Sequence, residues 1–149
     1  MERAAPDTRI LGNLRRFFER RPEVAAACLF GSTATGRAGP LSDVDIGVLL
    51  AESERTRLSA SLDYQAELLA ETMGLLKRDD VDLVLLHEAP PLLAHRVLRS
   101  GIFFYVADER ALAEFRFQAL QRYLDTKPIR KAQAEALERR ISSGRFARR

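Results

Sequence analysis

Two apolar runs flank a segment rich in Gly, Thr and Pro, and this arrangement restricts the fold more than any other feature of the sequence. Residues 24–30 form the first run, and Asp43 and Asp45 introduce the second, which continues to Leu50. Short apolar runs bounded by turn residues predict buried strands. Gly31 and Ser32 directly follow the first run. A glycine turn and two acidic side chains are therefore expected at the ends of two core strands.

The spacing of Asp43 and Asp45 favours a metal site. Side chains alternate between the two faces of a strand, so both carboxylates are expected on one face. Two carboxylates within about 7 Å repel each other unless a positive charge lies between them. Proteins usually hold Mg²⁺ with one or two carboxylates together with substrate phosphates. The pair is therefore interpreted as ligands of Mg²⁺.

Gly31 and Ser32 are candidates for phosphate binding. Gly31 allows the backbone to turn sharply and to approach a ligand closely. Ser32 is expected to cap a short helix, whose free N–H groups attract phosphate. An ordinary strand-to-helix turn with a serine cap would have the same geometry, so the two interpretations are compatible.

A third carboxylate lies in a later apolar run. Asp82 interrupts the run from Val81 to Leu86 near its start. If that strand lies beside the Asp43/Asp45 strand, three carboxylates and the nucleotide phosphates can hold two metal ions. Two such ions clamp the attacking and leaving oxygens of an in-line displacement. Asp79 and Asp80 are expected in the preceding loop, although a shift of two residues would give the role to Asp80.

The pattern Gly31-Ser32, ten residues, then Asp43-Val44-Asp45 resembles the GS-x10-DxD signature of the nucleotidyltransferase superfamily with the DNA polymerase β-like fold. The later Val81-Asp82-Leu83 also matches. The size of the chain resembles the minimal nucleotidyltransferases of the MntA type, which are antitoxins paired with HEPN-domain toxins of the HepT type. The resemblance covers roughly residues 8 to 126.

This resemblance implies an enzyme that transfers AMP from ATP to a hydroxyl, with two Mg²⁺ ions on Asp43, Asp45 and Asp82. Asp82 would lie nearest the acceptor hydroxyl and could also act as general base. The acceptor would be a tyrosine of a HEPN-domain ribonuclease toxin, so the chain would act as an antitoxin.

One position departs from the family pattern. Many members carry a basic residue three positions after the serine, where this chain has Thr35. Arg37, two residues later, is the candidate for supplying the missing charge to the triphosphate. Without a replacement, triphosphate binding should weaken. A stoichiometric toxin-binding antitoxin with weak or no catalysis is therefore an alternative.

The C-terminal residues are basic and raise a further alternative. Residues 127–149 carry eight Lys and Arg against two Glu, within a net charge of +3 for the chain. Such a tail attracts RNA or an acidic partner, or is simply a solvated terminus. It is the only support for a nucleotidyltransferase that acts on RNA or on a small alcohol such as an aminoglycoside.

The expected architecture is α/β (α+β), with a short mixed sheet flanked by helices. Residues 1–126 would form the nucleotidyltransferase domain and residues 127–149 a basic C-terminal helix or tail. Helices are predicted over residues 8–21, 54–77, 91–100 and 108–125, with a separate one after Pro128. Residues 102–106 predict a strand at or near a sheet edge. The single Cys28 excludes a disulfide within the chain, which favours a cytoplasmic protein without a membrane anchor.

Overall fold

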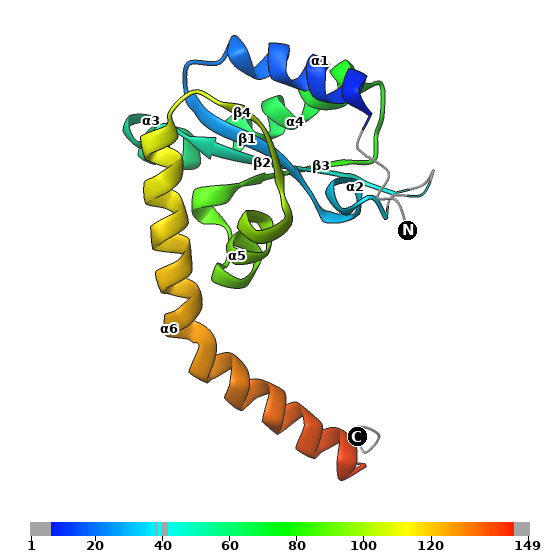
Figure 1. Ribbon diagram of the computed structural model, residues 1–149, viewed down its shortest axis with the longest axis vertical. Coiled ribbons are helices and arrows are strands. Elements are labelled where there is room, and N and C mark those ends of the chain that lie inside the picture. Colours follow the sequence, from blue (N-terminus) through cyan, green and yellow to red (C-terminus); the bar gives the residue numbers. More distant parts are fainter. Residues whose placement is uncertain (1–6, 38, 40–41, 145–149) are drawn as a thin grey trace.

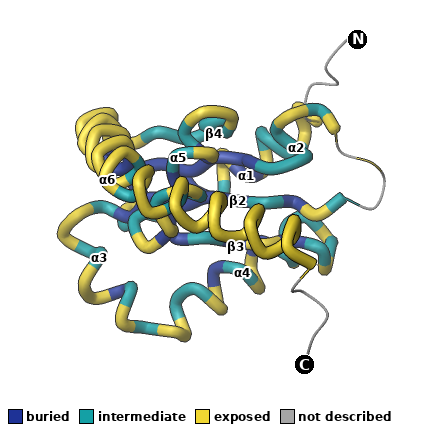
Figure 2. Tube along the Cα trace, turned by 90° about the horizontal axis from the view of Figure 1, so that it is seen from below, coloured by how far each residue is buried: buried dark blue, intermediate teal, exposed yellow. Residues whose placement is uncertain are grey.

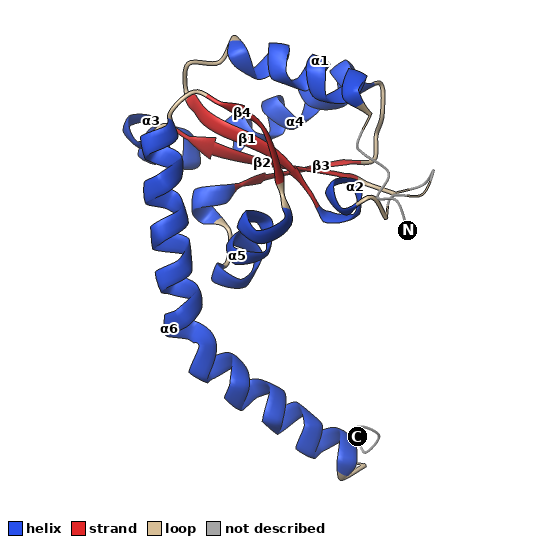
Figure 3. Cartoon of the chain, viewed as in Figure 1, coloured by secondary structure: helices blue, strands red, loops and turns tan. Residues whose placement is uncertain are grey.

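A four-stranded mixed sheet with the order β3-β2-β1-β4 runs through the computed structural model, with helices on both of its faces (Figure 1, Figure 3). The structure describes residues 7–37, 39 and 42–144. The strands are β1 (Val24–Phe30), β2 (Val44–Leu50), β3 (Val81–Leu85) and β4 (Ile102–Val106). The helices are α1 (Thr8–Glu19), α2 (Gly31–Thr35), α3 (Glu52–Ser59), α4 (Leu62–Leu76), the short 3-10 helix η1 (Leu86–Glu88), α5 (Pro91–Ser100) and α6 (Glu109–Ser142).

The pairing of the strands brings the sequence motifs to one end of the sheet. Strands β1 and β2 are antiparallel, with Phe30 opposite Asp45. Strands β2 and β3 are parallel, with Asp45 opposite Asp82. The adjacency of these two strands, which was the condition for Asp82 to join the other carboxylates, is therefore present. Strand β4 pairs with the other side of β1 and forms an edge of the sheet.

Two hydrophobic layers enclose the sheet. On one face, Leu14 and Phe18 of α1 and Leu68 of α4 pack against side chains of β1, β2 and β3. On the other face, α5 and the first part of α6 contribute Val97 and Phe115. Every residue of β1 is buried, whereas most of α6 is exposed (Figure 2). The central strands therefore form a rigid support for residues at their ends.

The helix predicted over residues 54–77 is in fact two helices. Helix α3 ends at Ser59 and α4 begins at Leu62. The Ser61 side chain accepts a hydrogen bond from the backbone N–H of Tyr64, at 3.3 Å. Serine competes for backbone groups in this way and favours helix starts over helix interiors. The apolar periodicity continued across this break and concealed it.

Helix α6 passes through Pro128 without ending, so the separate helix predicted after this residue is wrong. Proline removes one helical N–H donor and usually kinks or breaks a helix. Here the Arg130 side chain donates to the Tyr123 carbonyl at 2.9 Å and to the Thr126 hydroxyl. Its guanidinium also lies 4.2 Å from the centre of the Tyr123 ring. The domain boundary expected between residues 126 and 127 falls inside this helix. Residues 145–149 of the basic tail lie outside the described residues.

In the described part of the chain, none of the helices combines the length and the apolar character needed to cross a membrane.

Candidate active site

Gly31 forms the turn between β1 and α2 with a φ of 69°, which is the left-handed region. A Cβ atom at this position would lie 2.2 Å from Oδ2 of Asp45. Both the backbone conformation and the close approach of the carboxylate therefore require glycine. The sharp turn predicted at Gly31 is present.

Ser32 does not cap the helix after this turn. Helix α2 begins at Gly31, its N-cap position is Phe30, and no side chain caps its first turn. Because the helix starts one residue earlier than predicted, Ser32 lies inside the first turn and is half-buried. Its carbonyl accepts the backbone N–H of Arg37 at 3.1 Å. The first N–H groups of α2 have no partner within the helix, and Gly31 at its start lies beside Asp45.

Asp43, Asp45 and Asp82 lie at this end of the sheet, and their charges interact. Asp43 precedes β2 and is exposed, Asp45 is half-buried within β2, and Asp82 is exposed on β3. Burial raises the pKa of the Asp45 carboxyl, and the negative charges of Asp82 and Asp43 raise it further. No ion pair among the residues that the structure describes involves Asp45.

Oxygen donors and unbalanced negative charge fit a hard divalent cation such as Mg²⁺. The carboxylates are not, however, drawn together around one point. Among the described residues, no three His, Cys, Asp or Glu side chains form a ready group of metal ligands. Oδ1 of Asp82 accepts the backbone N–H of Leu83 at 2.9 Å, so this carboxylate is turned toward its own strand. The carboxylate oxygens are therefore suitable ligands for Mg²⁺, but in this structure the side chains are not arranged as a complete ligand group.

Hydroxyl groups of α2 connect the turn to the carboxylates. Thr33 donates to the backbone carbonyl of Asp43 at 3.0 Å. Thr35 instead donates to the carbonyls of Gly31 and Ser32, at 3.2 and 3.3 Å. Thr35 thus faces its own helix, and Arg37 is the exposed cation that follows α2.

Sequence reasoning missed Arg78. Its Nε donates to Asp80 at 2.7 Å and its Nη2 donates to the carbonyl of Ser42 at 2.9 Å. The hydrogen bonds from Arg78 lower the pKa of the Asp80 carboxyl. Asp80 is therefore engaged in an ion pair, and Asp82 rather than Asp80 is in register with Asp45. The spacing of Arg78 and Asp80 in the sequence could have indicated an ion pair between them. It does not indicate that Arg78 also contacts the Ser42 carbonyl.

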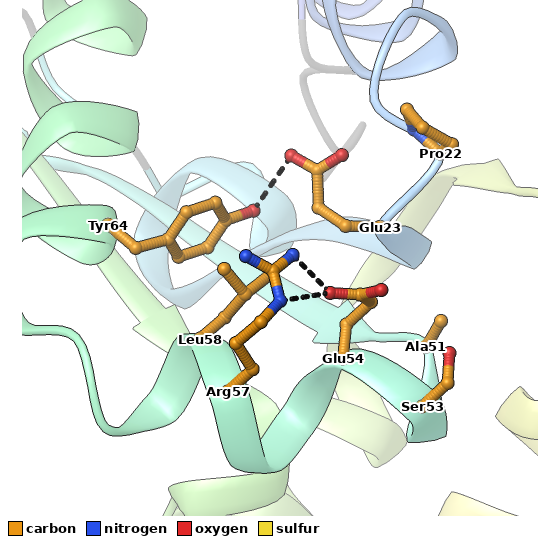
Figure 4. Close-up of a pocket in the computed structure, with 8 residues that line it drawn as sticks. All are labelled: Pro22, Glu23, Ala51, Ser53, Glu54, Arg57, Leu58 and Tyr64. Atoms are coloured by element: carbon orange, nitrogen blue, oxygen red, sulfur yellow. Dashed lines mark hydrogen bonds and ion pairs between the residues drawn. The ribbon is translucent and has the colours of Figure 1, made fainter.

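A pocket of about 400 Å³ opens at the opposite end of the sheet (Figure 4). Within it, the Tyr64 hydroxyl donates to Glu23 at 3.2 Å, and Arg57 pairs with Glu54. These polar groups satisfy one another, and the pocket contains none of the candidate site residues. It is lined by Pro22, Glu23, Ala51, Ser53, Glu54, Arg57, Leu58 and Tyr64.

Comparison with known proteins agrees with this arrangement. Residues 12–110 match the family described as polymerase beta, nucleotidyltransferase. A protein adenylyltransferase MntA from Aphanizomenon flos-aquae is 28% identical over 126 residues, which cover 83% of this chain and 84% of that relative.

Solved structures share the fold. A toxin-antitoxin crystallised with AMP-PNP has a TM-score of 0.72 at 23% identity and covers 86% of this chain and 98% of its own. An MntA-HepT toxin-antitoxin has a TM-score of 0.68 at 21% identity, covering 89% and 99%. A tri-AMPylated Shewanella oneidensis HEPN toxin in complex with an MNT antitoxin has a TM-score of 0.64 at 23% identity, covering 92% and 99%. With two thirds of its length matched by the family model, the chain belongs to the polymerase beta nucleotidyltransferase family.

Proposed function

We propose that this protein is an antitoxin that transfers AMP from ATP to a hydroxyl, a tyrosine side chain, of a cognate HEPN-domain ribonuclease toxin. The observation that carries this proposal is the register of Asp45 with Asp82 beside the turn at Gly31. The relatives support it, since one is named a protein adenylyltransferase and another was solved with an AMPylated HEPN toxin.

Different residues bind the triphosphate and the metal ions in this transfer. The triphosphate of ATP lies against Gly31 and Ser32 at the start of α2, where backbone N–H groups are free to donate. Arg37 supplies the positive charge that Thr35 lacks. Asp43, Asp45 and Asp82 would hold Mg²⁺, two ions in the complete site. When bound, these ions would neutralise phosphate charge and orient the reacting oxygens.

The reaction itself is an in-line displacement at the α-phosphorus. Asp82, exposed at the open side of the site, accepts the proton of the acceptor hydroxyl. The hydroxyl oxygen bonds to the α-phosphorus while the bond to the β-phosphate oxygen breaks, and pyrophosphate leaves. Strands β2 and β3 hold Asp45 and Asp82 in register, so positioning and charge neutralisation provide most of the acceleration.

Helix α6 favours a protein as the acceptor. Most of the large apolar side chains that remain exposed in the described residues lie on this helix, and an accumulation of exposed apolar side chains favours a protein contact. The solvent-exposed apolar side chains of α6 are Phe117, Leu120, Leu124, Ile129, Leu137 and Ile141.

A reducing cytoplasm, where ATP is available, suits the single buried thiol of Cys28.

Intact-mass measurement of a HEPN-domain toxin tests the proposal. The toxin is incubated with this protein, ATP and Mg²⁺, and we expect its mass to rise by one or more AMP units. The double variant Asp43→Asn/Asp45→Asn, which preserves side-chain size but removes both charges, should abolish the increase. An unchanged toxin mass with the wild-type protein would overturn the proposal.

A stoichiometric, non-catalytic antitoxin is the second candidate, and Thr35 is the observation that favours it. The Thr35 side chain is uncharged, and its hydroxyl donates to backbone carbonyls of α2, so it offers a triphosphate neither a charge nor a free donor. On this reading, the Asp43→Asn/Asp45→Asn variant would still neutralise the toxin at equimolar concentration. Loss of neutralisation with retention of the complex would exclude it.

A further inference from the structure

The segment from Arg78 to Asp80 holds the backbone on both sides of Asp43. The peptide carbonyl before Asp43, that of Ser42, accepts Nη2 of Arg78 at 2.9 Å. The peptide N–H after Asp43, that of Val44, donates to the backbone carbonyl of Asp80 at 2.9 Å. Asp43 itself lies outside β2 and is exposed, so without these bonds the strand ladder would not fix it.

Arg78 is itself held in a fixed orientation. Two nitrogens of its guanidinium pair with the two carboxylate oxygens of Asp80, one of them at 2.7 Å. A two-point contact of this kind fixes the plane of the guanidinium, which a single ammonium cannot do. Lys77 before it adopts a φ of 53° as the C-cap of α4, and the N–H of Arg78 donates to the Met73 carbonyl at 3.2 Å. The end of α4 therefore places the Arg78 side chain beside the segment that precedes β2.

We propose that Arg78 is a positioning residue, which acts through the Ser42 carbonyl to hold Asp43 where it can bind the catalytic metal ion. This inference rests on the proposed function, because it requires Asp43 to be a metal ligand. The third bond to this region, from Thr33 to the Asp43 carbonyl at 3.0 Å, comes from α2. Arg78 and Thr33 thus fix Asp43 relative to β3 and to the phosphate-binding turn, respectively.

Positioning and simple electrostatics predict opposite effects of substitution. A positive charge near Asp43 opposes cation binding, so removing that charge alone would strengthen the binding of a divalent metal. Loss of positioning would instead weaken metal binding. Residues that orient metal ligands typically change metal affinity by about 10- to 100-fold when they are replaced.

Mn²⁺ affinity, measured by electron paramagnetic resonance without nucleotide, separates these effects. Arg78→Lys keeps the positive charge but loses the two-point contact of the guanidinium with Asp80, and Arg78→Gln loses both the charge and that contact. We expect both variants to bind Mn²⁺ about tenfold more weakly than the wild type. The matched control is Arg57→Gln, which breaks the exposed pair with Glu54 on α3 and should bind Mn²⁺ as the wild type does.

Hydrogen exchange of the metal-free proteins provides the second measurement. In the Arg78 variants, the Val44 amide should exchange several-fold faster, while amides in the core of β1 remain protected. Wild-type affinity in Arg78→Lys, or tighter binding in Arg78→Gln, would overturn the inference and leave the proposed function intact. Failure of the wild type itself to bind Mn²⁺ would also overturn the inference, because it requires Asp43 to bind the metal in the nucleotide-free protein. The proposed function would then still be decided by the mass of the toxin.

Discussion

At the scale of single residues, Gly31 is the position with the least tolerance for change. Its left-handed φ costs an L-residue about 1–2 kcal/mol, and an added Cβ would overlap Oδ2 of Asp45 at 2.2 Å. We expect Gly31→Ala to displace this carboxylate and to lower the transfer rate by about 100-fold or more, because a misplacement of 1 Å can have that effect. Steady-state kinetics with the toxin as acceptor would measure it.

Gly12→Ala is the matched control for this substitution. Gly12 lies within α1, and a Cβ there would have no neighbour within 4 Å. Alanine should raise the free energy of unfolding by about 0.5–1 kcal/mol and leave transfer unchanged. Full activity in Gly31→Ala would mean that the close approach of the turn to Asp45 has no part in the chemistry.

Single residues also show where sequence reasoning succeeded. The placement of Gly31 and Asp45 at strand ends was predictable from the apolar runs and turn residues around them, whereas the roles of these residues and of Asp82 stay predictions. The contacts of Arg78 were not predictable, because its partner Ser42 is 36 positions away and accepts through a backbone carbonyl. The helix cap predicted at Ser32 was wrong, since Gly31 with its positive φ allowed the helix to begin one residue earlier.

At the scale of elements, His87 connects the end of β3 to α3. Its Nε2 is 2.6 Å from the Ser59 hydroxyl, and its Nδ1 is buried without a hydrogen-bond partner. Burial lowers the pKa of His87 below its ordinary value of 6.5, and the charge of Arg55 lowers it further. The folded protein therefore favours the neutral imidazole.

This lowered pKa makes stability depend on pH. Below pH 6.5 the unfolded chain takes up a proton at His87 before the folded protein does, so the free energy of unfolding falls as the pH decreases. Urea denaturation at pH 7.5 and pH 5.5 should show a larger loss for the wild type than for His87→Gln. An equal loss in both proteins would show that other groups govern the acid sensitivity.

The elements themselves were largely predictable, and the exceptions have local causes. The four strands and α1 and α5 follow from apolar runs, caps and prolines in the sequence. The break between α3 and α4 was hidden because the apolar spacing continues through Ser61. The continuity of α6 was hidden because proline usually breaks or kinks a helix, whereas this helix runs through Pro128.

At the scale of the whole molecule, the second half of α6 projects from the domain (Figure 1). The buried residues of this helix end at Ala119. A chain of residues 1–126 should therefore keep its core and unfold cooperatively. It loses the contact between Arg130 and Tyr123, worth about 0.5–1 kcal/mol, so its melting temperature should fall by roughly 2–6 °C. Circular dichroism melting would measure the change, and a broad, non-cooperative transition would contradict the prediction.

The parallel pairing of β2 with β3 also has a consequence for synthesis on the ribosome. Strands β1 and β2 can pair as soon as Leu50 has emerged, because they are consecutive strands separated only by residues 31–43. Asp82 arrives after α3 and α4, and parallel strands require such a crossover before they can pair. A nascent chain that ends before residue 82 therefore has at most two of the three carboxylates. Under the proposed mechanism, AMP transfer begins only after this long-range pairing forms, so a chain that ends before Asp82 cannot transfer AMP.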